Sequence, residues 1–489
     1  MPSSRHYLTK SRFLSGLQCR KRLWLGVNHP ELATPPSLKQ QFVFDSGYEF
    51  EDIVMKRYPE GVLVEFDKAK KDNLDSMVSI TKDLINDNAP VIFQGAFYHD
   101  GVYVISDIIR KNRDGTWELK EMKASTGVKD VHFPDLAIQK YILENNGLYV
   151  KDTYVIHIDT SGLLPDLNSM VGVEKTTPYV SQLNVGEVVK NFQELIQEES
   201  EPDVMIGDHC TKPYECEFKD YCWKDIDEYS MLNFRGMTWK KRLQYYSSGI
   251  KDIRALPPET KLTDNQWDYV SRLTNKEVSI DKEGIQKKLS ELEYPLYFFD
   301  FETTQRAIPR WEGVHPYQQI PFQWSCHIMD ENGEMTHEEY LHDKDSDPRY
   351  GLSEALVNTI GNKGSVIAYN ARFESGELNN LADFFPDLSE KLLSIDSRLW
   401  DQLDIFKKYY RDYRFGRSNS IKNVLPVIDP ELDHKNLELS SGDEADVYWY
   451  MMLDEKDPEK KAQLRKTLLE YCKLDTWAMV VIHKHLESL

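Results

Sequence analysis

The chain has 489 residues, a formal net charge of -21, 40% hydrophobic residues and 12% aromatic residues. This length favours two to four domains that each bury a core, and the composition argues against a disordered chain. The negative charge excludes a general attraction to nucleic acid, so a protein acting on nucleic acid would need local basic grooves or bound metal ions. The sequence lacks a signal-peptide core and any run of transmembrane length, which predicts a cytoplasmic protein without structural disulfides.

The first patterned stretch, residues 10–24, predicts a short helix with a basic face and one cysteine, Cys19. The other cysteines form a triplet, with five residues between neighbours, and a C-terminal pair: Cys210, Cys216 and Cys222, then Cys326 and Cys472. The pair is expected in the core. A distant cysteine and a triplet can supply four thiolates to one site, which suits either zinc or an iron–sulfur cluster.

A predicted hairpin between these cysteines carries two acids and a lysine. Residues 101–110 alternate towards Asp107, Asp114-Gly115 is a turn signal, and the returning strand carries Glu121 and Lys123. Residues two apart on a strand share a face. The two acids could therefore bind a divalent metal, while the lysine positions water or stabilises developing charge.

This hairpin resembles the RecB-like branch of the PD-(D/E)xK nucleases. The resemblance implies a restriction-endonuclease-like α/β core, with metal-binding acids and a catalytic lysine on the hairpin. It also implies a metal-binding role for Glu51, where that branch often has His, and a catalytic role for Gln139 on the helix after the lysine strand. Tyr141 follows Gln139 by two residues, whereas the branch usually has four.

The order of the cysteines strengthens this resemblance. In the part of the branch that includes the AddB nuclease and the CRISPR-associated adaptation nucleases, one cysteine before the core and three after it hold a four-iron cluster. The present chain has the same order. The resemblance therefore implies a RecB-like domain of residues 1–224 that contains a [4Fe-4S] cluster. The branch usually has a Cys-x-x-Cys step that is missing here, so zinc remains the alternative. Either metal would tie the first helix to the end of the domain.

Residues 225–293 are charged and contain three short helical patterns, at 239–248, 249–256 and 264–273. They carry no constellation of acids. This composition favours a helical connector, and the alternative is an element that binds a nucleic-acid backbone.

Three segments of the C-terminal part end in acids. The apolar run from Tyr294 leads into Asp300 and Glu302, which are two positions apart and share one face of the expected strand. A shorter apolar run, residues 366–369, precedes Glu374. These acids are hard oxygen ligands of the kind that divalent metals require.

Near the C-terminus, Tyr471 and Asp475 are four apart in a helical pattern and therefore share a face. Four acids and a tyrosine suit a two-metal site that cleaves phosphodiesters. The pattern resembles the tyrosine subclass of the DnaQ-like 3′→5′ exonucleases over about residues 290–489. The resemblance implies a ribonuclease H-like fold, Mg²⁺ or Mn²⁺ bound by the four acids, and a tyrosine that orients or deprotonates the attacking water. The third acid of that family is usually Asp, whereas this chain has Glu374.

A polar turn at residues 416–422 contains side chains that could bind phosphate or form an ordinary solvated turn: Arg417, Ser418, Ser420 and Lys422.

The whole chain resembles a bacterial family that fuses a RecB-like domain with four cysteines to a DnaQ-like domain, here residues 294–489. The expected function is a metal-dependent nuclease with two active sites, which acts on ends or single strands of DNA. One alternative is an RNA exonuclease. The other is a non-catalytic nucleic-acid-binding scaffold with degenerate sites. No membrane partner is expected.

Overall fold

The computed structural model describes residues 7–65, 73–180, 183–432, 439 and 442–489. The chain forms two compact α/β units, each with its own sheet and helices. The first unit contains residues 1–251 and 306–317, and the second contains 252–305 and 318–489. Residues 225–293, where the composition favours a connector, are thus divided between the units. Among the described residues, no helix is both long and apolar enough to cross a membrane.

The sheet of the first unit has seven strands in the order β2-β3-β4-β5-β6-β7, with β1 also paired to β4. The pairs β3–β4, β4–β5 and β6–β7 are antiparallel, while β5 and β6 are parallel. The strands are β1 (Leu8–Thr9), β2 (Gly61–Leu63), β3 (Val91–His99), β4 (Val102–Lys111), β5 (Trp117–Lys123), β6 (Val150–Ile158) and β7 (Val171–Lys175). The predicted hairpin of two strands around Asp114-Gly115 is therefore confirmed as β4 and β5.

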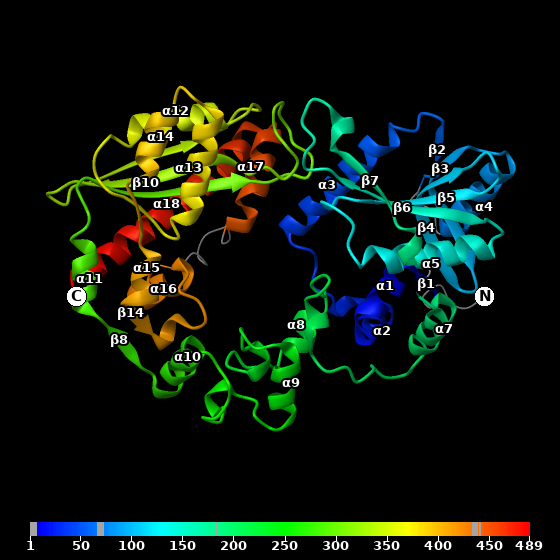
Figure 1. The fold of residues 1–489 in the computed structure, drawn as a ribbon, viewed down its shortest axis with the longest axis horizontal. Helices are drawn as coiled ribbons and strands as arrows, with labels where there is room; N and C mark the ends of the chain where they lie inside the picture. Colours follow the sequence, from blue (N-terminus) through cyan, green and yellow to red (C-terminus); the bar gives the residue numbers. More distant parts are fainter. Residues whose placement is uncertain (1–6, 66–72, 181–182, 433–438, 440–441) are drawn as a thin grey trace. The chain divides into compact units, whose positions relative to one another are not determined.

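Helices cover both faces of this sheet (Figure 1). The larger core lies between the sheet and α1, α4, α5 and α7, where Leu119 of β5 and Leu136 of α5 are fully buried. On the opposite face, Phe50 of α3 packs near Met122 of β5. The described helices longer than one turn are α1 (Lys10–Gln18), α2 (Arg20–Asn28), α3 (Leu38–Met55), α4 (Asn73–Asn86), α5 (His132–Asn145), α7 (Val185–Leu195), α8 (Lys219–Trp223) and α9 (Trp239–Ser247).

The stretch expected to form one helix over residues 10–24 forms two, so that expectation is wrong. Cys19 separates α1 from α2 and has an extended backbone, with φ -160° and ψ 122°. Its N–H still donates to the carbonyl of Ser15, and its own carbonyl accepts the N–H of Leu23. The backbone hydrogen bonds are thus satisfied on both sides of the break, which is why one residue can interrupt the helical pattern.

A segment between two strands of the second unit belongs to the first unit. Residues 306–317 place Ala307 and Ile308 in the core on the α3 side of the sheet. Arg306 donates to both carboxylate oxygens of Glu49 at 2.6 Å, and the Tyr317 hydroxyl donates to the carbonyl of Ala124 at 2.7 Å. The segment is therefore held by an apolar core and by specific polar contacts.

The second unit has a five-stranded sheet in the order β11-β10-β9-β12-β13. The neighbours of β10 are antiparallel to it, while β12 is parallel to both β9 and β13. The strands are β9 (Leu296–Thr304), β10 (Ile320–Met329), β11 (Met335–Leu341), β12 (Val366–Ala368) and β13 (Leu399–Asp401); β8 (Val278–Ile280) and β14 (Tyr410–Asp412) form a separate pair.

Alternation along β9 decides which residues face which helices. Tyr297, Phe299 and Phe301 pack towards α12, α13 and α14. Leu296 and Phe298 face the other way, towards Met479 and Val480 of α18. The described helices longer than one turn are α10 (Asp264–Asn275), α11 (Lys282–Leu289), α12 (Arg349–Thr359), α13 (Arg372–Phe384), α14 (Ser389–Asp396), α15 (Leu403–Lys408), α16 (Ile421–Ile428), α17 (Ala445–Asp454) and α18 (Pro458–Glu487).

Candidate functional site

The second unit brings the predicted acids of the C-terminal part together. Asp300 and Glu302 continue the face of β9 that packs towards α18, as their period-2 spacing predicts. Asp475 and Tyr471 lie on α18, and Glu374 lies in the first turn of α13. The expected clustering of these three chain segments is confirmed.

The carboxyl groups lie close enough to raise one another's pKa. Burial is the main cause that lifts the pKa of Asp300 well above its usual value, followed by the charges of Asp475, Glu302 and Glu374. Burial also raises the pKa of Glu374 to about 8. These two carboxyl groups share a hydrogen bond, so without a cation the site favours a bound proton.

Tyr471 lies in the field of the same acids. Burial, and then the charges of Asp475, Glu302 and Asp300, raise the pKa of Tyr471 far above its usual value. The hydroxyl therefore stays protonated at neutral pH, which favours orienting a water molecule over deprotonating it.

The sequence-based assignment of Cys472 to the core is incomplete. Its side chain is fully buried, but its Sγ and carboxylate oxygens of Asp300 and Glu302 all lie within 4.8 Å of one another. Among the described residues this is the only group of three metal-ligand atoms so close together. The sequence signal for placing Cys472 near the acids was that it directly follows Tyr471. Cys326, by contrast, is confirmed as a core residue.

Two further carboxylates near Glu374 were also missed. Asp401, at the end of β13, contributes to the raised pKa of Glu374 and accepts the N–H of Asn370 at 2.9 Å. Glu377, one turn after Glu374, is buried and has a pKa raised to about 7 by that burial. The i, i+3 spacing on one helix was the signal for Glu377.

A cation could satisfy groups that the described residues leave unsatisfied. Oε2 of Glu374 and Oε2 of Glu377 are buried and accept no hydrogen bond from the described residues. Buried carboxylate oxygens without partners are costly. The donor set is mostly hard oxygen, which fits Mg²⁺ or Mn²⁺.

The polar turn at residues 416–422 supplies a positive charge near this site. The ammonium of Lys422, in the first turn of α16, lies 5.7 Å from the centroid of the Tyr471 ring. Phosphate binding by side chains of this turn remains a prediction. The position of Lys422 beside Tyr471 is compatible with it.

In the first unit, Glu121 lies at the centre of a second polar cluster. Its Oε1 accepts Lys123 at 2.7 Å, and its Oε2 accepts the amide of Gln139 at 2.7 Å. Glu121 and Lys123 share a face of β5, as their spacing predicts, and Gln139 reaches them from α5. Burial alone would raise the pKa of Glu121, but Lys10 and Lys123 hold it well below its usual value.

Asp107 and Glu51 lie near Glu121, and each accepts a hydrogen bond from a different neighbour. Burial, and then the charge of Glu121, raise the pKa of Asp107 to about 8, and its Oδ2 accepts the N–H of Met122 at 2.7 Å. Burial and the same charge raise the pKa of Glu51, whose Oε2 accepts the amide of Gln94 at 3.3 Å. Gln94 has a positive φ of 53° and lies between the paired residues Phe93 and Gly95 of β3.

Two residues of this cluster were not foreseen. Asp135 accepts Lys123 at 2.8 Å and Gln139 at 2.8 Å, and Lys10 lies 2.8 Å from Glu121. The position of Asp135 four residues before Gln139 on one helix was its signal. Nothing in the pattern around Lys10 distinguished it from a solvated lysine. Tyr141 points elsewhere, with its ring against His99.

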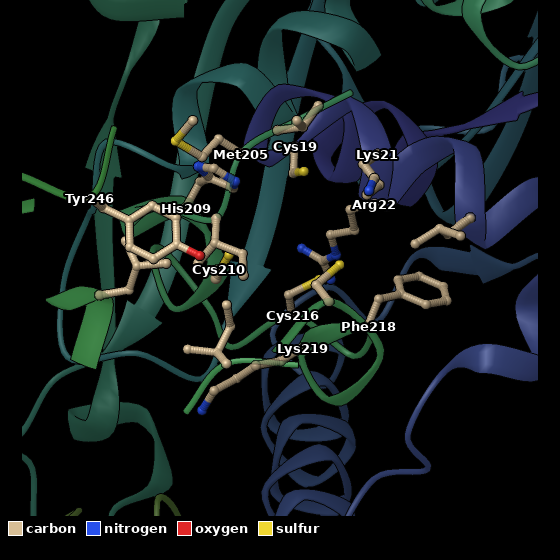
Figure 2. Close-up of a pocket in the computed structure, with 16 residues that line it drawn as sticks. Cys19, Lys21, Arg22, Met205, His209, Cys210, Cys216, Phe218, Lys219 and Tyr246 are labelled. Carbon is tan, nitrogen blue, oxygen red and sulfur yellow. The ribbon is translucent and has the colours of Figure 1, made fainter. Parts of the chain in front are cut away.

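The four predicted cysteine ligands line one cavity of about 260 Å³ in the first unit (Figure 2). Cys19 lies at the junction of α1 and α2. Figure 2 shows that Cys210 and Cys216 belong to other chain segments around the same cavity. Cys222 lies on α8 and lines the same cavity. The expected gathering of a distant cysteine with a triplet is confirmed.

The surroundings of the thiols fit a metal site. Burial raises the pKa of Cys216 to about 12, so a bare cavity would hold neutral thiols. The cations of Lys21 and Arg22 line the cavity and would favour thiolates. No three sulfur atoms of these four described cysteines lie within 4.8 Å of one another, so a single zinc ion, with Zn–S distances of about 2.3 Å, would draw them closer.

Comparison with known proteins adds one finding. A family model described as a domain of unknown function (DUF2779) matches residues 297–420. This range includes Asp300 and Glu302 of β9 and also Glu374, but it ends before α18 with Tyr471 and Asp475. No curated protein matches the chain.

Proposed function

We propose that the chain is a metal-dependent nuclease with two active sites, of which the one in the second unit is a DnaQ-like 3′→5′ exonuclease. The observation that carries this proposal is the gathering of Asp300, Glu302, Glu374, Asp475 and Tyr471 from three chain segments. An ordinary folded protein separates or neutralises buried carboxylates, because their mutual repulsion destabilises the fold. Perturbed pKa values of this kind are typical of functional sites.

The topology of the second unit supports the proposed ribonuclease H-like fold. The central strand β9, which carries two of the acids, pairs antiparallel with β10 on one side and parallel with β12 on the other, in the order β11-β10-β9-β12-β13. The acids lie on the face towards α18, which brings Asp475 and Tyr471. Fold alone does not assign an activity, which depends on the residues of the site.

The side chains of the site have three kinds of role in the proposed reaction: binding metal ions, orienting water and contacting phosphate. Two divalent ions, when bound, supply an activated water and stabilise the leaving oxygen. Asp300, Glu302, Glu374 and Asp475 would hold these ions. The protonated hydroxyl of Tyr471 orients the attacking water. Lys422 contacts a backbone phosphate and so holds the strand end in register.

Digestion of end-labelled single-stranded DNA and RNA with Mg²⁺ or Mn²⁺ tests this site. Wild-type protein should shorten 5′-labelled DNA in single-nucleotide steps, and Asp300→Asn should abolish the steps while leaving the circular dichroism spectrum unchanged. Glu354→Gln, an exposed acid of α12, is the matched control and should trim normally. RNA trimming without DNA trimming would favour the RNA exonuclease alternative. Trimming that survives in Asp300→Asn would refute the assignment.

The cluster around Glu121 supports a second, RecB-like nuclease site in the first unit. The strands β3, β4, β5 and β6 with α3 and α5 give an order of elements that fits a restriction-endonuclease-like core. Asp107, Glu121 and Glu51 would hold a divalent ion that activates water. Lys123 orients that water and stabilises the charge that develops on the phosphate, and Gln139 fixes Glu121.

A substrate without a usable 3′ end separates this activity from the first. In an Asp300→Asn background, cleavage of circular single-stranded DNA should depend on Lys123 and should be lost in Lys123→Met. Lys151→Met, which removes an exposed lysine from β6 of the same sheet, should cleave as well as its parent. If Lys123→Met and its parent give the same products, the first unit has no such site.

The proposal includes a [4Fe-4S] cluster, or zinc, bound by Cys19, Cys210, Cys216 and Cys222. Four thiols that line one cavity support it, and the cations beside them favour thiolate ligands. Such a site suits a reducing compartment, so a cytoplasmic location is part of the proposal. Metal analysis of protein purified without oxygen distinguishes the two metals: iron with sulfide, or zinc at one equivalent.

A further inference from the structure

The polar cluster of the first unit contains a cation that the proposed reaction does not use. Lys10 is the first residue of α1, and its ammonium lies 2.8 Å from Oε1 of Glu121 and 3.5 Å from Oδ1 of Asp135. The same Glu121 oxygen also accepts Lys123, and the other accepts Gln139. Both oxygens of the central predicted metal ligand are therefore engaged by this chain's own donors.

The ammonium of Lys10 lies at ion-pair distance from two acids of this cluster, Glu121 and Asp135. Two ammonium groups, those of Lys10 and Lys123, thus lie among the acids that would hold a divalent ion. Consistent with this arrangement, no three of the described acids of this cluster have oxygens within 4.8 Å of one another.

The helix that carries Lys10 is held in place along its length. Phe13 packs edge to face on Phe192 of α7, with ring centroids 5.8 Å apart. A Cβ at Gly16 would lie 2.6 Å from the Phe192 ring, so α1 and α7 approach more closely than any larger residue allows. The amide of Gln18 donates to the carbonyls of His209 and Tyr214 in the cysteine loop. The backbone of Lys10 is therefore fixed, and its side chain stays within reach of Glu121.

We propose that Lys10 is an internal cation that competes with the divalent metal ion for Glu121, and so sets the metal affinity of the first unit's site. This inference rests on the proposed nuclease function of that site. Lys123 and Gln139 have parts of their own there, which leaves the Lys10 ammonium as the group that yields when a metal ion enters. A positive charge about 4–6 Å from a binding cation opposes its binding, and the effect is strong where water is excluded.

The test is the affinity for Mn²⁺ alone, measured by titration calorimetry without nucleic acid in an Asp300→Asn background. Lys10→Met should bind Mn²⁺ at least about tenfold more tightly than the parent, because one competing charge is gone. Lys10→Arg keeps the charge and should retain the parent affinity. Lys190→Met, at an exposed position of α7, is the control for loss of a lysine and should also match the parent.

A purely structural role for Lys10 would give a different pattern. Unchanged or weaker Mn²⁺ binding in folded Lys10→Met would overturn the competition, and so would tighter binding in Lys10→Arg. Glu121→Gln separates this failure from failure of the proposed site. If Glu121→Gln binds Mn²⁺ as the parent does, the metal site around Glu121 does not exist, and the proposed function of the first unit falls together with the inference.

Discussion

The pKa of Glu374 makes a quantitative prediction for the metal-free protein. The carboxyl group is almost fully buried, and its pKa is about 8 against an ordinary value of 4.5. Folding therefore takes up a proton between these two pH values. The stabilisation from the protonated group is complete below about pH 4.5 and is lost as the pH rises towards 8.

Glu374→Gln isolates this contribution, because glutamine has the shape of the protonated acid and does not titrate. Each pH unit of mismatch is worth about 1.4 kcal/mol. At pH 7 the variant should therefore be more stable than wild type by about 3 kcal/mol. At pH 4.5 the two proteins should have nearly equal free energies of unfolding. Saturating Mn²⁺ should stabilise wild type at pH 7 and have less effect on the variant.

Hydrogen–deuterium exchange reports on the second unit alone when peptides from β9 and α18 are followed. The protein is treated with EDTA, exchange is measured from pH 5 to pH 8, and the intrinsic pH dependence of amide exchange is removed. Glu354→Gln, at an exposed position, should follow wild type throughout. Equal pH profiles for wild type and Glu374→Gln would refute the reasoning, because the acid would then titrate normally in the folded protein.

Three other outcomes follow from the sites. Cys19→Ser should lower the melting temperature of the first unit and Cys326→Ser should not, since only the first removes a tie between distant segments; the crosslink model gives an upper figure of about 5 kcal/mol. Equal melting curves would contradict a shared four-thiol site. Tyr471→Phe should lower kcat for 3′ trimming and leave Mn²⁺ affinity unchanged, so an unaltered rate would remove the hydroxyl from the reaction. Lys422→Gln should raise KM and flatten the dependence of KM on salt, with little change in kcat; an unaffected KM would show that the turn is merely solvated.

Local patterns predicted the elements that carry the sites. Alternation placed Asp300 and Glu302 on one face of a strand, and the same rule placed Glu121 beside Lys123. These predictions succeeded because strand geometry and i, i+4 helix spacing depend only on neighbouring residues. The break at Cys19 was missed, because no glycine or proline marks it and the hydrogen bonds on both sides remain satisfied.

Contacts between distant segments could not be predicted in the same way. The approach of Lys10 to Glu121 depends on how α1 packs against α7, which joins residues far apart in the chain. The assignment of residues 306–317 to the first unit depends on burial of Ala307 and Ile308 in a core built from other segments. Patterns within one stretch carry no information about such packing. The cysteines were an exception, since a shared metal requires their side chains to meet.

The central claim is that this chain cleaves phosphodiester bonds at two separate sites. The most direct measurement compares four proteins on 5′-labelled linear and on circular single-stranded DNA with Mn²⁺: wild type, Asp300→Asn, Lys123→Met and the double variant. Asp300→Asn should lose only the single-nucleotide ladder, Lys123→Met should lose only cleavage of the circle, and the double variant should be inert. A double variant that cleaves like wild type would contradict the account.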